Sequence, residues 1–187
     1  YSVDGAAAFC VFMCLIAIMN ETPDIVVSGI NKGANMGDDV IHSGTLGAAF
    51  TARKLKYPPI ASSIAGRSFE HFDSSILATE KIHNNIEEKN NEEQQERIVF
   101  NVNVPNLPFT EIEGFSFTKL GNRGIPLAPE FKEEDGKATY KIGKSGTPVG
   151  ELEGTDFESI RSNKVSVTPL YWNMTKLDLK RGKLPNE

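Results

Sequence analysis

Short apolar runs alternate with longer amphipathic stretches along this chain, a pattern typical of buried strands joined by helices. The first expected strand contains the short β-branched run Ile25 to Val27, which suits a strand buried on both faces of a parallel sheet, and the second expected strand also reads as buried. A strand, a helix and a second strand in succession imply a parallel crossover connection. The sequence therefore predicts an α/β fold, with strands expected at 25–27, 60–64, 98–104 and 164–170 and helices at 6–19, 43–55, 69–89 and 155–161.

The first expected helix, Ala6–Met19, is apolar on every side, which predicts a helix sandwiched inside the fold and capped by Asp4. A membrane span or signal sequence is the alternative, but this run of 14 residues is shorter than the roughly 20 that cross a bilayer and lacks basic flanks. Cys10 and Cys14 are the only cysteines, so we expect small core residues and neither a disulfide framework nor a zinc site. This favours a reducing compartment and a cytoplasmic location.

The texture of the sequence changes after residue 111. Apolar and polar residues alternate from Ile112 to Leu120, and Asp135 with Gly136 forms a hairpin turn signal. Three parts are therefore expected: a core over 1–110, a β-hairpin appendage over 111–152, and a return helix and strand with a polar tail over 153–187. Within the core, the polar run 84–97 is expected to be a solvated helix end or a flexible insertion.

A glycine-rich stretch follows the first expected strand. Gly29, Gly33 and Gly37 recur every fourth residue with Asn31 and Asn35 between them, so the backbone can turn sharply and approach a ligand closely. The spacing differs from the G-x-G-x-x-G dinucleotide fingerprint, and no segment of the chain matches the ATP-binding P-loop.

Periodic order resumes at the second expected helix. Ser43 or Thr45 can cap this helix, and Gly44, which has no side chain, lets a sheet or a bound anion lie close to its first turn. The N-terminus of a helix offers free backbone N–H groups and a favourable dipole to a phosphate. Strand, loop and helix together favour a phosphate-sized site, and ordinary connection chemistry is the alternative explanation.

Several motifs in this chain resemble those of the SurE survival-protein family of metal-dependent phosphatases. The resemblance begins in the glycine-rich stretch and continues over nearly the whole chain in the family's order and approximate spacing. Its residues lie at 1–5, 28–45 (Ser-Gly-Ile-Asn-x-Gly-x-Asn-x-Gly-x-Asp-x-x-x-Ser-Gly-Thr), 101–105 (Asn-Val-Asn-Val-Pro), 120–123 (Leu-Gly-x-Arg), 153–157 (Glu-Gly-Thr-Asp-Phe) and 165–170.

The resemblance implies a Rossmann-like sheet and a hydrolase that converts nucleoside 5′- or 3′-monophosphates to nucleoside and phosphate with Mg²⁺ or Mn²⁺. It also implies a homodimer or tetramer formed through the appendage. Asn31 follows the strand directly and is the candidate metal ligand, because its amide oxygen suits a hard cation. The candidate phosphate-binding residues are Gly33, Asn35, Ser43, Gly44 and Thr45.

Two aspartates, Asp38 and Asp39, lie beside the loop, and we expect them to brace it rather than to bind metal. The resemblance places the metal-binding aspartate pair upstream of Tyr1, so residues 1–187 alone are expected not to turn over. His42 could donate a proton but is expected to be structural. The net charge of −5 argues against a nucleic-acid duplex as partner, and no membrane partner is expected.

One position departs from the family pattern. The opening motif usually continues with a hydroxyl residue and a carboxylate, whereas this chain has Ala6 to Phe9. This departure keeps a second hypothesis open, a non-catalytic relative that binds nucleotide or phosphate.

Overall fold

A five-stranded sheet forms the centre of the computed structural model, which describes residues 2–66, 68–89 and 97–173. The first three strands in the sheet are parallel, β9 is antiparallel to β3, and β4 is parallel to β9. The predicted α/β fold with a mostly parallel sheet is therefore confirmed. The strands lie in the order β1 (Val27–Lys32), β2 (Ile60–Ala65), β3 (Ile98–Pro105), β9 (Val165–Tyr171) and β4 (Phe115–Phe117).

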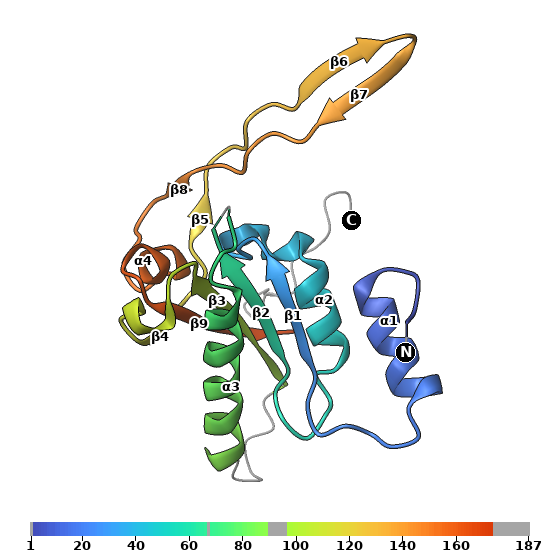
Figure 1. Cartoon of the computed structure of the whole chain (residues 1–187), viewed down its shortest axis with the longest axis vertical. Helices are drawn as coiled ribbons and strands as arrows, with labels where there is room; N and C mark the ends of the chain where they lie inside the picture. The colour runs from blue at the N-terminus through green and yellow to red at the C-terminus, as the bar shows by residue number, and fades with distance from the viewer. Residues whose placement is uncertain (1, 67, 90–96, 174–187) are drawn as a thin grey trace, which may run out of the picture.

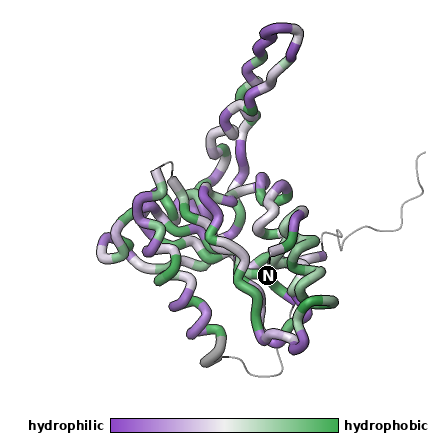
Figure 2. Tube along the Cα trace, turned by 45° about the vertical axis from the view of Figure 1, so that its right-hand side comes forward, coloured by the Kyte–Doolittle hydropathy of each residue, from purple (hydrophilic) through white to green (hydrophobic). Residues whose placement is uncertain are grey.

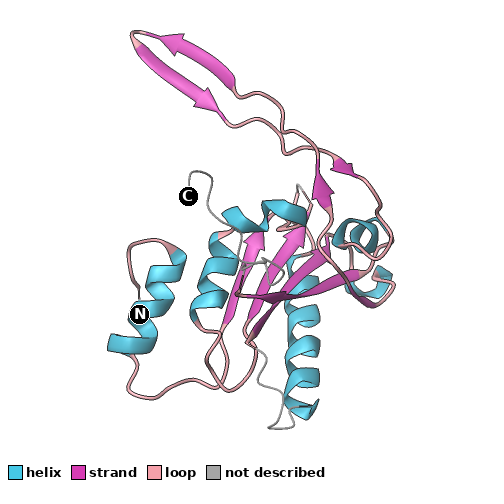
Figure 3. Cartoon of the chain, turned by 180° about the vertical axis from the view of Figure 1, so that it is seen from behind, coloured by secondary structure: helices cyan, strands magenta, loops and turns pink. Residues whose placement is uncertain are grey.

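Helices cover both faces of this sheet, as Figures 1 and 3 show. On one face α2 (Gly44–Thr51) packs Leu46 and Ala49 against Ala61 and Val99. On the other face lies α3 (Phe72–Lys89), and the apolar cluster beneath it contains Ile60, Ala78, Ile82, Val102, Val104, Val165 and Val167. Val99 of β3 thus packs on the α2 side of the sheet, whereas Val102 and Val104 pack on the α3 side, as the two-residue period of a strand requires.

The first helix lies in an outer layer, so the prediction that it is sandwiched inside the fold is wrong. It comprises α1 (Ala7–Met13) and a π-helical turn (Cys14–Ile18), and none of its residues is buried. It packs against α2, where a Cβ on Gly47 would lie 3.7 Å from that of Ala8, and α2 in turn lies against the sheet. Phe9 and Ile16 remain 53% and 71% exposed.

The predicted cap of the first helix is also wrong, because Ala6 occupies the N-cap position and no side chain accepts a hydrogen bond there. Within the described residues, no helix combines the length and the hydropathy that a membrane crossing requires.

The first strand begins two residues later than predicted and lies at the edge of the sheet, so Val27 is 43% exposed instead of buried on both faces. Pairing with β2 carries the strand through the first glycine of the motif and opposes Asn31 to Ser63. A Cβ on Gly29 would overlap the carbonyl oxygen of Ser62, so only glycine fits this close approach. The glycine-rich stretch therefore starts within the sheet.

A β-hairpin arm projects from the sheet (Figure 1). Asp135 and Gly136 have positive φ angles of 51° and 72°, which confirms the predicted turn. The strands of the arm are β6 (Glu130–Glu134) and β7 (Lys137–Lys141), and its base is formed by β5 (Asn122–Arg123) and β8 (Pro148–Val149). The strand β4, which the sequence assigned to the appendage, belongs instead to the central sheet.

Near the C-terminal end, α4 (Asp156–Arg161) begins as predicted. Thr155 caps it, because its hydroxyl accepts a hydrogen bond from the N–H of Glu158 at 3.3 Å. The predicted insertion lies partly, and the predicted tail after Met174 wholly, outside the described residues.

Candidate phosphate-binding site

The candidate site lies at the carboxyl ends of the parallel strands, where α/β sheets bind their ligands. Asn31 is opposite Ser63 in the register of β1 and β2, and the side-chain amide of Asn35 donates to Ser63 Oγ at 2.7 Å. The backbone N–H of Gly33 also donates to the carbonyl of Ile64, 3.1 Å away. These contacts bring three of the predicted site residues to the end of one neighbouring strand.

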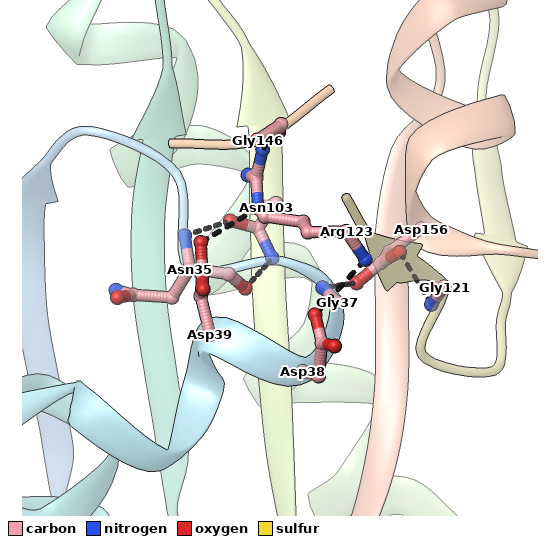
Figure 4. Close-up of polar contacts among 9 residues, drawn as sticks. All are labelled: Asn35, Gly37, Asp38, Asp39, Asn103, Gly121, Arg123, Gly146 and Asp156. Atoms are coloured by element: carbon pink, nitrogen blue, oxygen red, sulfur yellow. Dashed lines mark hydrogen bonds and ion pairs between the residues drawn. The ribbon is translucent and has the colours of Figure 1, made fainter. Parts of the chain in front are cut away.

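The peptide groups of Asn35 are held by two buried side chains from β3. Asn103 Oδ1 accepts from the N–H of Asn35 at 2.8 Å, and the Asn103 amide donates to the backbone carbonyl of Asn35 at 2.9 Å (Figure 4). The amide of Asn101 donates to the same carbonyl, also at 2.9 Å. Among the described residues no donor reaches the buried Oδ1 of Asn101, which leaves this acceptor open to water or a ligand. Asn35 is therefore chiefly an anchor of the loop.

Asn101 and Asn103 were given no role by the sequence analysis, although a signal was present. The two asparagines alternate with valines in β3, so a strand period places both on one face of the sheet. Buried amides need hydrogen-bond partners, and the glycine-rich loop supplies them.

Asn31 presents its amide oxygen away from its one internal contact. Its Nδ2 donates to the carbonyl of Gly33 at 2.8 Å, and no donor within the described residues contacts its Oδ1. This oxygen can serve as a metal ligand, but the described part of the chain has no group of three or more His, Cys, Asp or Glu side chains placed to hold an ion. Among the described residues, the Asn31 amide oxygen is therefore not accompanied by a cluster of acidic, histidine or cysteine ligands.

The N-terminus of α2 faces the same loop. Ser43 is its N-cap, and the hydroxyl oxygen of Ser43 accepts from the N–H of Leu46 at 3.1 Å. The backbone N–H groups of Gly44 and Thr45 have no acceptor among the described residues, as expected for the first turn of a helix. The predicted capping is confirmed, and two N–H groups remain for an anion.

The aspartates Asp38 and Asp39 fasten the loop to the base of the arm. Asp38 Oδ1 accepts from the backbone N–H of Arg123 at 3.0 Å, and Asp39 Oδ2 lies 2.7 Å from Nε of the same arginine. Arg123 Nη1 in turn donates to the carbonyl of Gly146 on the other side of the arm's base at 3.0 Å. Both carboxylates therefore brace the loop, as expected, while His42 is exposed.

A buried carboxylate, Asp156, completes the attachment. It accepts hydrogen bonds from the N–H groups of Gly37, Gly121 and Phe157 at 2.7, 3.0 and 2.9 Å (Figure 4 draws the first two). Burial raises the pKa of Asp156, and the three N–H donors and the positive charge of Arg123 oppose this shift without cancelling it. From the sequence, Asp156 was expected only as part of a helix start and of the 153–157 motif, with no contact to the loop.

Known proteins share both the sequence and the fold of this chain. Residues 1–126 match the family model described as survival protein SurE. The chain is 39% identical over 181 residues to the 5′-nucleotidase SurE of Legionella pneumophila strain Corby, covering 96% of this chain and 70% of that protein. It is 40% identical over 182 residues to the 5′-nucleotidase SurE of Actinobacillus pleuropneumoniae serotype 5b, covering 92% and 70%.

A solved structure agrees with these relatives. The crystal structure of the SurE protein from Aquifex aeolicus superposes with a TM-score of 0.75 at 33% sequence identity, covering 92% of this chain and 69% of that one. The glycine-rich loop, with Asn31 at the end of β1 and Ser43 at the start of α2, lies within the stretch that matches the family model. This chain therefore belongs to the survival protein SurE family.

Proposed function

We propose that this protein is a hydrolase that converts nucleoside 5′- or 3′-monophosphates to nucleoside and phosphate. Relatives named 5′-nucleotidase SurE, about 40% identical over most of the chain, support this activity. The observation that carries the proposal is that the glycine-rich loop joins Asn31, near the end of β1, to the first turn of α2, where the backbone N–H groups of Gly44 and Thr45 have no acceptor among the described residues.

The loop residues of this chain bind and orient the phosphate. The N–H groups of Gly44 and Thr45 donate to phosphoryl oxygens at the positive end of the helix dipole. Gly33 has a φ angle of +116° and no atom within 4 Å of where a Cβ would be, so its backbone is open to a ligand. Donors held in place before the reaction stabilise negative charge as it grows on the phosphoryl group.

A divalent cation, Mg²⁺ or Mn²⁺, is part of the proposal, with Asn31 as one ligand. When bound, such an ion supplies Lewis-acid polarisation of the phosphoryl oxygens. Lys32, which follows Asn31, is exposed and adds positive charge beside the loop. A cytoplasmic location is proposed on the same basis as before, the two free cysteines.

Release of inorganic phosphate from nucleoside monophosphates tests this function. In the full-length protein we expect turnover with added Mg²⁺ or Mn²⁺ and none in excess chelator, whereas residues 1–187 alone are expected not to turn over. Replacing Thr45 with valine removes a hydroxyl from the site, so the inhibition constant for inorganic phosphate should rise about tenfold, within the roughly 1–3 kcal/mol of a lost polar contact.

The matched control is Thr51→Val on the same helix, since the Thr51 hydroxyl donates to the carbonyl of Gly47 inside the helix. An unchanged inhibition constant in Thr45→Val would leave Thr45 with a structural role only. Chelator-resistant turnover would contradict the metal-dependent reaction. Metal-independent nucleotide binding without turnover would favour a non-catalytic binding protein, the reading that the Phe9 departure motivates.

We also propose that the arm carries a self-association surface. Every residue of β6 and β7 is exposed, and their tip is largely hydrophilic in Figure 2. Phe131 and Tyr140 nevertheless lie side by side on one face, with ring centroids 4.9 Å apart. A two-stranded ribbon cannot bury an apolar face by itself, so this pair suits a second copy of the chain.

Removing the aromatic pair should yield monomers. In light scattering, the molar mass of the double variant Phe131→Ser/Tyr140→Ser is expected to be half that of the parent or less. Lys132 and Thr139 form the adjacent cross-strand pair on the opposite face, so Lys132→Ser/Thr139→Ser is the matched control and should keep the parent mass. An unchanged mass in the aromatic variant, or a monomeric parent, would contradict the assignment.

A further inference from the structure

The carboxylate of Asp156 joins three segments that lie far apart in the sequence. Its Oδ2 accepts from the N–H of Gly37, which is 119 residues away in the glycine-rich loop. Its Oδ1 accepts from Gly121 at the base of the arm and from Phe157 in the first turn of α4. One oxygen therefore binds the glycine-rich loop at Gly37, and the other binds Gly121 and Phe157 in the part of the fold to which the loop is attached.

The two glycines that donate to this carboxylate pack tightly against the ring of Phe157. Gly37 has a φ angle of +65°, and a Cβ there would lie 2.8 Å from the ring of Phe157. A Cβ on Gly121 would overlap the same ring, and the guanidinium carbon of Arg123 lies 4.8 Å from its centroid. These five residues, Gly37, Gly121, Arg123, Asp156 and Phe157, form the loop junction.

Only a carboxylate satisfies the loop junction as it is built. All three backbone partners are N–H donors, and they approach two different oxygen atoms. Among neutral side chains, an amide offers one acceptor and one donor, and a hydroxyl offers a single oxygen. An ionised carboxylate presents two acceptor oxygens and no donor, and the three N–H donors offset part of the cost of burying its charge.

We propose that Asp156 is a positioning residue for phosphate binding, because its Oδ2 fixes the conformation of the loop between Gly33 and Ser43. This inference rests on the proposed function. The loop enters from β1 and leaves into α2, and Asp38 and Asp39 hold its middle to Arg123. The bond to Gly37 fixes the point at which the loop turns back toward the helix that presents Gly44 and Thr45 to the anion.

The variant Asp156→Asn separates the two halves of the junction. The amide oxygen can keep the two hydrogen bonds to Gly121 and Phe157, and the amide NH₂ must then face the N–H of Gly37, donor against donor. We expect the Gly37 amide to exchange with solvent at least about tenfold faster by NMR, with Gly121 and Phe157 within about threefold of the parent. Inorganic phosphate should bind about tenfold more weakly by calorimetry.

Asp135→Asn is the matched control, because it makes the same change of charge at the exposed tip of the arm. It should leave the exchange of Gly37 and the binding of phosphate as in the parent. Equal acceleration at Gly37, Gly121 and Phe157 would mean that Asp156 has a general structural role, and this would overturn the inference. Unchanged phosphate binding with a faster Gly37 would overturn it as well.

Measurements on the parent keep the inference testable if the variant does not fold. Saturating inorganic phosphate should slow the exchange of the Gly37 amide at least about threefold relative to that of Gly121, because ligand binding stabilises the conformation that binds it. Phosphate binding without this change would overturn the inference. A parent that binds no phosphate would refute the proposed function itself, while the exchange of Gly37 in Asp156→Asn would still report on the contact.

Discussion

Replacing Asn31 with alanine in the full-length protein is expected to lower the rate of nucleotide hydrolysis about 100-fold and to weaken Mg²⁺ or Mn²⁺ binding at least about tenfold. The amide oxygen of Asn31 is the proposed metal ligand, and no donor among the described residues contacts it. Its Nδ2 makes a single local hydrogen bond to Gly33, so the fold should lose little stability. Metal titration and thermal melting separate the two effects.

Asn85→Ala is the matched control for this substitution. Asn85 is exposed on α3, and its Nδ2 also makes one local hydrogen bond, to the carbonyl of Lys81 at 2.7 Å. This variant should keep the rate and the metal affinity of the parent. Metal affinity that does not change in Asn31→Ala would remove Asn31 from the site, whereas a large drop in melting temperature would make its role structural.

The second large effect is expected at Gly37, where alanine should destabilise the fold by about 3 kcal/mol or more. The left-handed conformation of this glycine, with φ at +65°, costs an L-residue roughly 1–2 kcal/mol. A Cβ would also lie 2.8 Å from the Phe157 ring and 3.0 Å from the carbonyl oxygen of Gly121, and this overlap costs a further 1–3 kcal/mol. Urea unfolding measures the sum.

Gly154 allows the two contributions to be separated. Its φ angle of +70° is nearly the same, but the nearest atom to its would-be Cβ is 4.0 Å away on the Lys119 side chain. Gly154→Ala should therefore cost only the conformational part, about 1 kcal/mol. Equal losses of unfolding free energy in both variants would show that the loop junction accommodates an added methyl group and is not tightly packed.

Elements with a clear period could be predicted from the sequence. The buried strands β2 and β3, the helix α3 and the turn at Asp135 and Gly136 carry local signals, an apolar run, a helical spacing or a turn pair. The first helix was placed in the wrong layer because hydrophobicity around a helix does not say which element it packs on. Small residues on α2, such as Gly47 opposite Ala8, let the first helix pack on α2 instead of on the sheet.

The candidate site was predictable only in its local parts. Ser43 indicated the start of a helix, and the spaced glycines indicated a sharp turn of the backbone. The contacts of Asp156 and Arg123 with the loop were not predictable, because a hydrogen bond between residues 119 positions apart leaves no periodic trace in the sequence. The same holds for the edge position of β1, which depends on how the whole sheet is ordered.

The distance along the chain between Gly37 and Asp156 also sets an order of events during synthesis. The loop is translated early, but the carboxylate that holds it leaves the ribosome 119 residues later. At about 5–20 residues per second, this interval lasts roughly 6–24 s. The strands β1 to β3 can pair in that time, and Asn101 and Asn103 of β3 can hold Asn35, while the N–H of Gly37 has no carboxylate to accept its hydrogen bond. The turn at Gly37 is thus made well before the side chain that fixes it.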